Sequence, residues 1–208
     1  MAFKLPRVYP ITDVRLSGLS HAEQVARLSA GGATLIQIRE KDLPPHEFYH
    51  EAAVAVRVAR ERGVQLIIND RVDIAMALGA DGVHLGQTDF PPEAARRLLG
   101  GHAIIGYSTH NIEQARFAAK LPIDYLAIGP ILETSSKRNP DPVLGLDLLT
   151  RVRAAIGRIP LVAIGGITLT NAFEVINAGA DSVAMIEDLL HNADISARMR
   201  EMLNLAQK

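Results

Sequence analysis

Short apolar runs rich in β-branched residues alternate with stretches of helical period along this chain of 208 residues. Such alternation is typical of repeated βα units, which build a parallel sheet. The apolar runs occupy residues 7–12, 34–39, 65–69, 82–86, 103–108, 125–129, 161–165 and 182–186. Eight strands that alternate with helices predict an α/β protein with the fold of a (β/α)8 TIM barrel. The length of the chain suits a single domain over residues 1–208.

An internal repeat supports the barrel. One template is shared by LGADGVHLG and AGADSVAMI, and GGATLIQIR is a looser copy of it. Each copy has a glycine between a helix and a strand, where a left-handed residue is wanted, so Gly32, Gly79 and Gly179 are predicted to be structural. An open doubly wound sheet is the alternative fold. It would usually carry a glycine-rich phosphate-binding turn after its first strand, and YPITD has none.

Charge and composition argue against several classes of partner. Lys and Arg number 22 against 23 Asp and Glu, which indicates no nucleic-acid surface and no general attraction to an anionic membrane. The absence of cysteine rules out a disulfide framework and thiolate chemistry. The apolar stretch in the segment MAFKLPRVYPITD is too short for a signal peptide. No apolar segment approaches the length that is needed to span a membrane. We expect a soluble cytoplasmic protein; the sequence leaves open whether it forms a homo-oligomer.

The segment LIQIREKD ends the second predicted strand with long polar side chains. Because successive side chains of a strand point to opposite faces, Gln37, Arg39 and Lys41 share one face and Glu40 lies on the other. A guanidinium and an ammonium buried together without a partner would be very costly. The sequence therefore predicts that an anionic ligand binds at this strand end.

Polar residues also follow the other predicted strands, where TIM-barrel enzymes keep their chemistry. They are Asn69 and Asp70 after the third strand, Asp89 after the fourth, Ser108 at the end of the fifth, and Thr134, Ser135, Ser136 and Lys137 in a long loop after the sixth. The length of that loop favours a lid over a plain solvated loop. A glycine pair after the seventh strand and a helix start after the eighth predict a phosphate site, the second anion site on this rim.

Asp70 and Asp89 follow adjacent predicted strands, so their carboxylates are expected to face one small volume. Two such carboxylates repel each other unless a cation lies between them, and hard oxygen ligands near phosphate suit Mg²⁺. Each aspartate also has a structural alternative, because Asn-Asp, and Asp before Pro-Pro, are ordinary ways to begin a helix. We favour the metal site for the pair.

Ser108 is predicted to point into the cavity, where its hydroxyl can donate to or accept from a heterocycle. In the residues that follow, Asn111 and Gln114 have the spacing of a capping box and are predicted to be structural. The role of His110 stays open: it is either a general base or a residue of the loop that leads to the helix cap.

Many motifs recur in a fixed order: YPITD, IQIREKD, IINDRVDIAMALGADGVHLGQTD, GYSTHN, DYLAIGPILETSSK, NPDPVLG, VAIGGIT and GADSVAMI. In this order, and over nearly the whole chain, they closely resemble the thiamin phosphate synthase family. The resemblance implies a transferase that joins 4-amino-5-hydroxymethyl-2-methylpyrimidine diphosphate to 4-methyl-5-(2-hydroxyethyl)thiazole phosphate and releases pyrophosphate, with Mg²⁺ required. It also implies the mechanism: ionisation at the pyrimidine's benzylic-type carbon, then capture of that cation by the thiazole nitrogen.

The resemblance assigns residues position by position. It implies a pyrimidine diphosphate site made of Gln37, Arg39, Glu40, Lys41, Asn69, Ser108 and Lys137. It implies Asp70 and Asp89 as metal ligands, and a thiazole phosphate site made of Thr134, Ser135, Ser136, Gly166, Ile186 and Glu187. The expected catalytic residues are Arg39, Lys41, Ser108 and Lys137.

Glu187 departs from the family pattern, because the family usually has a small serine beside the thiazole phosphate. A carboxylate there would place a like charge next to that phosphate. Two other functions stay open. Thiazole tautomerase-like enzymes share the barrel but typically lose the counterpart of Lys41 and the acidic metal residues, all of which are present here. A non-catalytic phosphate-ligand-binding barrel would be expected to lack the metal carboxylates.

Overall fold

The computed structural model describes residues 3–134 and 141–206. Its strands are all parallel and close into a barrel in chain order, with β8 paired to β1. They are β1 (Val8–Thr12), β2 (Leu35–Ile38), β3 (Gln65–Asn69), β4 (Gly82–Leu85), β5 (Ile104–Thr109), β6 (Tyr125–Ile128), β7 (Leu161–Ile164) and β8 (Ser182–Met185). The TIM barrel predicted from the alternating pattern is confirmed.

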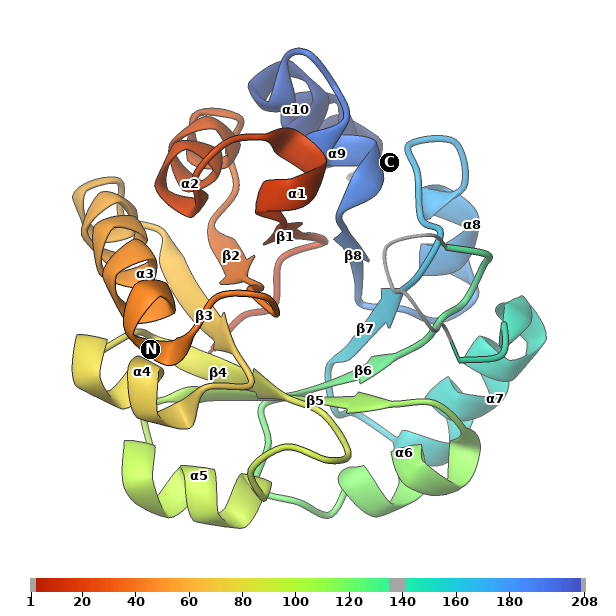
Figure 1. The fold of residues 1–208 in the computed structure, drawn as a ribbon. Coiled ribbons are helices and arrows are strands. Elements are labelled where there is room, and N and C mark those ends of the chain that lie inside the picture. The colour runs from red at the N-terminus through yellow and green to blue at the C-terminus, as the bar shows by residue number, and fades with distance from the viewer. Residues whose placement is uncertain (1–2, 135–140, 207–208) are drawn as a thin grey trace.

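Helices surround the barrel on its outside (Figure 1). They are α1 (Val14–Ser17), α2 (His21–Ala30), α3 (Pro45–Glu61), α4 (Val72–Leu78), α5 (Pro92–Leu99), α6 (Ile112–Ala118), α7 (Gly145–Ile156), α8 (Ala172–Asn177), α9 (Glu187–Leu190) and α10 (Ile195–Ala206). Over residues 3–134 and 141–206, none of them combines the length and the apolar character that crossing a membrane requires.

Local sequence determines where several helices begin and end. Ser20 and Glu23 form a capping box at the start of α2, which satisfies N–H groups that have no partner inside the helix. Gly79 ends α4 in the left-handed conformation with φ 59°. Gly32 and Gly179 also have positive φ. The structural role predicted for these three glycines is confirmed.

The strands are almost fully buried, because helices cover their outer faces and side chains fill the barrel. Towards the carboxyl ends, small side chains leave part of the interior open. These are Ala127 on β6, Val162 on β7 and Ala184 on β8. The opposite wall of the same space carries polar side chains: Tyr9, Gln37, Asn69, His84 and Ser108 on β1 to β5. The barrel thus places a polar wall opposite an apolar one.

Candidate active site

A cavity of about 480 Å³ opens at the carboxyl ends of the strands. Nine of the expected site residues line it: Gln37, Arg39, Lys41, Asn69, Asp70, Asp89, Ser108, Thr134 and Ile186. Enzymes with this fold keep their chemistry at this end of the barrel. Residues that are far apart in the sequence therefore surround one volume.

A second cavity of about 140 Å³ adjoins the first. Gly166 and Glu187 line it, whereas Thr134 and Ile186 line both cavities. Gly166 has φ 65°, and a Cβ at this position would lie 2.2 Å from the carbonyl oxygen of Glu133. Only glycine fits there, and it brings the backbone itself to the wall of the cavity.

Four expected residues remain. Ser135, Ser136 and Lys137 lie outside the described residues. Glu40 points to the other side of its strand, as the alternation of side chains predicts, although the family resemblance assigns it to the diphosphate site.

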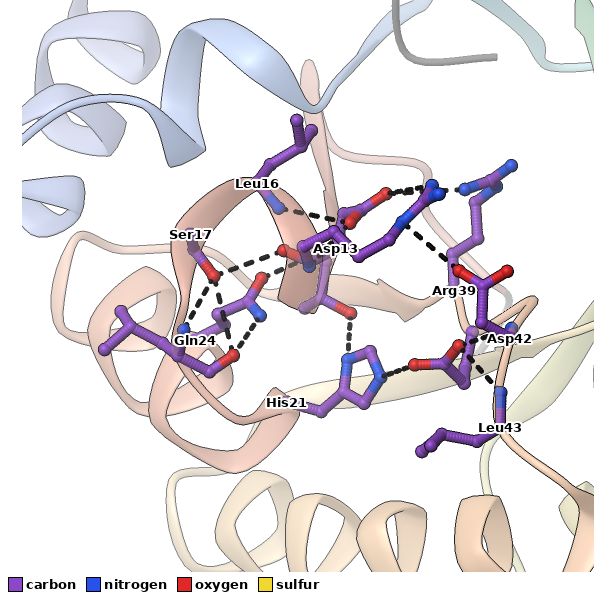
Figure 2. Close-up of polar contacts among 12 residues, drawn as sticks. Asp13, Leu16, Ser17, His21, Gln24, Arg39, Asp42 and Leu43 are labelled. Atoms are coloured by element: carbon purple, nitrogen blue, oxygen red, sulfur yellow. Dashed lines mark hydrogen bonds and ion pairs between the residues drawn. The ribbon is translucent and has the colours of Figure 1, made fainter. Parts of the chain in front are cut away.

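Arg39 is held by the carboxylate of Asp13, a residue that the sequence analysis did not single out. Arg39 Nη1 lies 3.5 Å from Asp13 Oδ2. The same carboxylate caps α1 by accepting from the backbone N–H groups of Arg15 and Leu16. Figure 2 shows Asp13 between α1 and the Arg39 guanidinium. Because Asp13 is only 4% exposed and fixed by the helix start, it orients Arg39 at the cavity.

Asp70 and Asp89 form the acidic part of the cavity wall, next to Lys41. Lys41 Nζ contacts the Asp70 carboxylate. Burial raises the pKa of Asp70 above its ordinary value; Lys41 opposes this shift, and the neighbouring Asp89 adds to it. Two carboxylates held together in this way would be stabilised by a further cation.

Neither aspartate caps the helix that follows it. The caps of α4 and α5 are Arg71 and Pro91, and neither makes a side-chain capping hydrogen bond. Asp70 instead adopts a left-handed backbone with φ 62°, and its N–H donates to the carbonyl oxygen of His84 at 2.8 Å. A non-glycine residue in this conformation is uncommon, although Asp and Asn tolerate it best. The helix-capping alternative is therefore wrong for both residues.

The two carboxylates suit a hard divalent cation that keeps part of its water shell. Within the ranges that the structure describes, no group of three or more His, Cys, Asp or Glu side chains is placed to hold a metal. The donor set thus fits an ion that is completed by water and by substrate oxygens. It does not fit a closed structural site, which needs four protein ligands.

A chain of hydrogen bonds crosses the barrel interior at the bottom of the cavity. Gln37 Nε2 donates to Tyr9 Oη at 3.0 Å, and Tyr9 Oη lies 2.8 Å from Tyr125 Oη. Tyr125 Oη lies 2.9 Å from His84 Nδ1, and His84 Nε2 lies 2.8 Å from Ser108 Oγ. Gln37 and Ser108 were expected at the site, whereas the three residues between them were missed. Their only signal is a polar atom at a buried position of an apolar strand.

Glu40 organises the loop after β2. Its Oε1 accepts from the backbone N–H groups of Asp42 at 2.7 Å and Leu43 at 3.2 Å. Its Oε2 lies 3.5 Å from Nε2 of the buried His21, whose Nδ1 is 2.7 Å from Thr12 Oγ1. Figure 2 shows His21 close to the loop that carries Asp42 and Leu43. Glu40 therefore acts on the loop that carries Lys41 and not on the cavity.

His21 predicts a pH dependence of stability. Burial lowers the pKa of its imidazole, whereas the unfolded chain keeps a value of about 6.5. The unfolded state therefore takes up a proton first as pH falls, so stability is complete above about pH 6.5 and declines below it. We expect His21→Gln to flatten the pH dependence of the free energy of unfolding below about pH 6.5. Urea unfolding at several pH values measures this, and equal slopes for both proteins would contradict it.

His110 also lines the main cavity. Its Nδ1 lies 2.7 Å from the carbonyl oxygen of Gly129 and 3.4 Å from Asp141 Oδ2, so this side of the ring is tied to the wall. Asn111 caps α6 by accepting from the Gln114 N–H at 2.8 Å, as predicted. Gln114 Oε1 accepts from the N–H of His110 and not from that of Asn111, so the expected capping box is shifted by one residue.

Comparisons with known proteins agree with this arrangement. The model of a family described as thiamine monophosphate synthase matches residues 8–189. The thiamine-phosphate synthase of Koribacter versatilis is 48% identical, and the match covers 97% of this chain and 96% of that protein. That of Chloroflexus aurantiacus is 42% identical, with 94% and 90% covered. The structure of thiamine phosphate pyrophosphorylase from Pyrococcus furiosus has a TM-score of 0.86 and 36% identity, with 97% and 95% covered.

These similarities extend over almost the entire chain and include the segments that line both cavities. The chain therefore belongs to the thiamine monophosphate synthase family, whose members are transferases of thiamine biosynthesis.

Proposed function

We propose that this chain makes thiamin phosphate by joining 4-amino-5-hydroxymethyl-2-methylpyrimidine diphosphate to 4-methyl-5-(2-hydroxyethyl)thiazole phosphate. The supporting observation is that Arg39 and Lys41 line the same cavity as the uncharged polar groups of Gln37, Asn69 and Ser108. The cations suit a diphosphate, and the uncharged donors and acceptors suit a heterocycle. Similarity to thiamine-phosphate synthases supports the same activity.

In this reaction the two cations act on the leaving group. As the bond between the pyrimidine methylene carbon and the diphosphate oxygen breaks, the diphosphate gains negative charge. Arg39 and Lys41 then stabilise it more than they stabilise the bound substrate. The thiazole nitrogen supplies the electron pair of the new bond to carbon, and pyrophosphate departs. The apolar wall formed by Val162 and Ala184 limits the access of water to the carbon cation.

Mg²⁺ is the ion that we propose for Asp70 and Asp89. When bound, it supplies positive charge to the diphosphate oxygens. Lys41 contacts Asp70 and lines the cavity, so it lies within the same charge network and holds the Asp70 carboxylate in place. The amide of Asn69 lines the cavity next to these residues and orients the substrate.

The thiazole phosphate is proposed to occupy the smaller cavity. That cavity shares part of its wall with the larger one, which lets the two substrates meet. Asp188 is one of its three acidic lining residues, with Glu133 and Glu187. The Asp188 carboxylate is already paired, because its Oδ1 accepts from Arg198 Nη2 at 2.7 Å and its Oδ2 from the Leu169 N–H at 3.2 Å. Backbone N–H groups near Gly166 can bind phosphate without a side chain.

Glu187→Ser therefore has a small expected effect. Backbone N–H groups near Gly166 are expected to determine the affinity for the phosphate. We expect the KM for thiazole phosphate to change by less than about threefold, or ~0.7 kcal/mol, at moderate ionic strength. Initial rates at varied thiazole phosphate measure this. A tenfold or larger fall in KM would show that the carboxylate reaches the phosphate, and would reopen the identity of the second substrate.

The experiment that tests the proposed function incubates the purified protein with both substrates, with and without Mg²⁺, and follows pyrophosphate and thiamin phosphate. We expect product only when both substrates and Mg²⁺ are present. Turnover of a thiazole substrate alone would favour a tautomerase-like enzyme. Binding of both phosphorylated ligands without turnover would favour a non-catalytic barrel. A cytoplasmic location would suit an enzyme that uses two charged phosphate esters.

A further inference from the structure

The hydrogen-bond chain from Gln37 to Ser108 has a direction that the structure allows us to work out. Burial raises the pKa of the phenols of Tyr9 and Tyr125, so both keep their single hydrogen. A neutral phenol donates one hydrogen bond, and a neutral imidazole donates through one ring nitrogen and accepts through the other. The direction of one bond therefore determines the direction of the next.

The direction is set at the Gln37 end. Gln37 Nε2 donates to Tyr9 Oη, which leaves the hydrogen of Tyr9 for Tyr125 and the hydrogen of Tyr125 for His84 Nδ1. Because Nδ1 then accepts, the imidazole proton is on Nε2 and donates to Ser108 Oγ. In this arrangement Tyr9, Tyr125 and His84 each donate one hydrogen to the next residue, and the hydroxyl hydrogen of Ser108 is left for the cavity.

The opposite direction leaves one hydrogen unmatched. If His84 Nδ1 donated to Tyr125 and Tyr125 donated to Tyr9, then Tyr9 would accept twice, from Tyr125 and from Gln37. Its own hydrogen would have no acceptor among these five residues, and Tyr9 is only 1% exposed. Buried hydroxyl groups without an acceptor are unfavourable.

Packing holds the middle of the chain rigidly. The rings of His84 and Tyr125 are stacked, with centroids 5.5 Å apart and an angle of 23° between the planes. They lie against Gly106 of β5, where a Cβ would be 2.1 Å from Tyr125 Cζ and 2.5 Å from His84 Nδ1. A glycine inside a strand often marks such a close approach. The absence of a side chain at Gly106 is therefore what makes room for this pair of rings.

We propose that Tyr9, Tyr125 and His84 are positioning residues that fix the Ser108 hydroxyl as a hydrogen-bond donor to the cavity. Ser108 accepts from His84, so its own hydrogen turns towards the ligand. It selects a ligand that presents an acceptor at this point, such as an unprotonated ring nitrogen, and discriminates against one that presents an N–H group. The identity of that ligand rests on the proposed function. The direction of the hydrogen-bond chain does not.

The direction is tested by NMR on the ligand-free protein with ¹⁵N-labelled histidine at a pH where histidine is neutral. The chain has 7 histidines, and the His84 signals are identified by their absence from His84→Gln. We expect the proton on Nε2 in the parent protein and also in Tyr125→Phe, because a proton moved to Nδ1 would then have no acceptor. We expect the ¹⁵N chemical shift of Nδ1 to change in Tyr125→Phe, because that nitrogen loses its hydrogen bond. A proton on Nδ1 in the parent protein, or an Nδ1 chemical shift that stays unchanged in Tyr125→Phe, would overturn the proposal whatever the activity.

Two substitutions of His84 test its effect on Ser108. The amide nitrogen of glutamine takes the place of Nε2 and can still donate to Ser108, whereas asparagine reaches only the place of Nδ1 and loses that contact. We expect His84→Asn to raise the KM for the pyrimidine diphosphate at least about tenfold, and His84→Gln to raise it less than about threefold. The reason is that only His84→Asn leaves the Ser108 hydroxyl without its hydrogen-bond donor. The KM for thiazole phosphate should change little in both.

Equal effects of the two substitutions, or equal changes in both KM values, would mean that His84 only fills space. Thermal unfolding of both variants identifies a general loss of stability. If the parent protein does not join the two substrates at all, the proposed function fails, but the tautomer measurement still decides the direction of the chain.

Discussion

Arg39→Ala is expected to lower kcat/KM by roughly 30- to 1000-fold, which corresponds to about 2 to 4 kcal/mol of transition-state stabilisation. The guanidinium lines the cavity and is held on one side by Asp13. In the proposed reaction it faces a diphosphate whose charge grows as the bond to carbon breaks. Lys41→Ala should have an effect of the same size for the same reason. Steady-state kinetics with both substrates measures it.

The loss of activity should exceed the loss of stability. The Arg39 side chain is 15% exposed, and without it the Asp13 carboxylate still accepts from the Arg15 and Leu16 N–H groups and lies 3.5 Å from Arg15 Nη2. We expect about 1 to 2 kcal/mol of destabilisation, or a Tm lower by roughly 3–8 °C. Kinetics well below the Tm separates the two effects.

Arg15→Ala is the matched control for Arg39→Ala. Arg15 contacts the same carboxylate but does not line the main cavity, so its removal should lower the Tm to a similar extent and leave kcat/KM nearly unchanged. Similar losses of kcat/KM in Arg15→Ala and Arg39→Ala would mean that both act by holding Asp13 and the start of α1. A variant Arg39→Ala that unfolds early but turns over normally when folded would mean that this strand end is structural.

The fold could be predicted from the sequence because the barrel repeats one local pattern. Each predicted strand begins and ends within one residue of its observed bounds, as for residues 34–39 against Leu35–Ile38. Parallel strands that are buried on both faces are nearly continuous apolar runs, and the helices between them keep a period of 3.6 residues. At every strand, the apolar pattern of the local sequence agrees with the position of that strand in the barrel. Such a fold can therefore be predicted from its sequence.

The rim of the site could be predicted for a related reason. Burying charged side chains at strand ends, such as Arg39 and Asp70, is unfavourable unless a partner balances their charge. Such positions in a sequence therefore indicate a ligand. Strand alternation also predicted that Glu40 lies opposite Arg39, and the structure agrees. The family resemblance alone would have placed Glu40 in the diphosphate site.

The floor of the site could not be predicted from the sequence. Tyr9, His84 and Tyr125 lie on three different strands, and they become partners only when the barrel closes. In a sequence, a tyrosine or histidine in an apolar strand looks like an ordinary core residue. Asp13 was missed because its contact with Arg39 depends on the pairing of β1 with β2.

Asp70→Asn is expected to raise the Mg²⁺ concentration for half-maximal rate at least about tenfold, because it removes one of two anionic ligands and keeps the shape of the side chain. The backbone at this position has φ 62°, a conformation that asparagine tolerates as well as aspartate. A change in backbone strain therefore cannot explain the result. Asp89→Asn should have a similar effect. Initial rates over a wide range of Mg²⁺, at saturating levels of both substrates, measure it.

Asp73→Asn is the matched control, since it makes the same change of charge three residues along the chain. Its carboxylate is paired with Arg71 at 2.8 Å, its side chain is 64% exposed, and it does not line the cavity, so the Mg²⁺ requirement should stay as in the parent. Asp70 has one competing role, which is to hold Lys41 in place. If that were its only role, Asp70→Asn would lower kcat at every Mg²⁺ concentration and leave the half-maximal concentration unchanged. A shift in Mg²⁺ dependence for Asp70→Asn and Asp89→Asn, but not for Asp73→Asn, is the result that only a metal ligand produces.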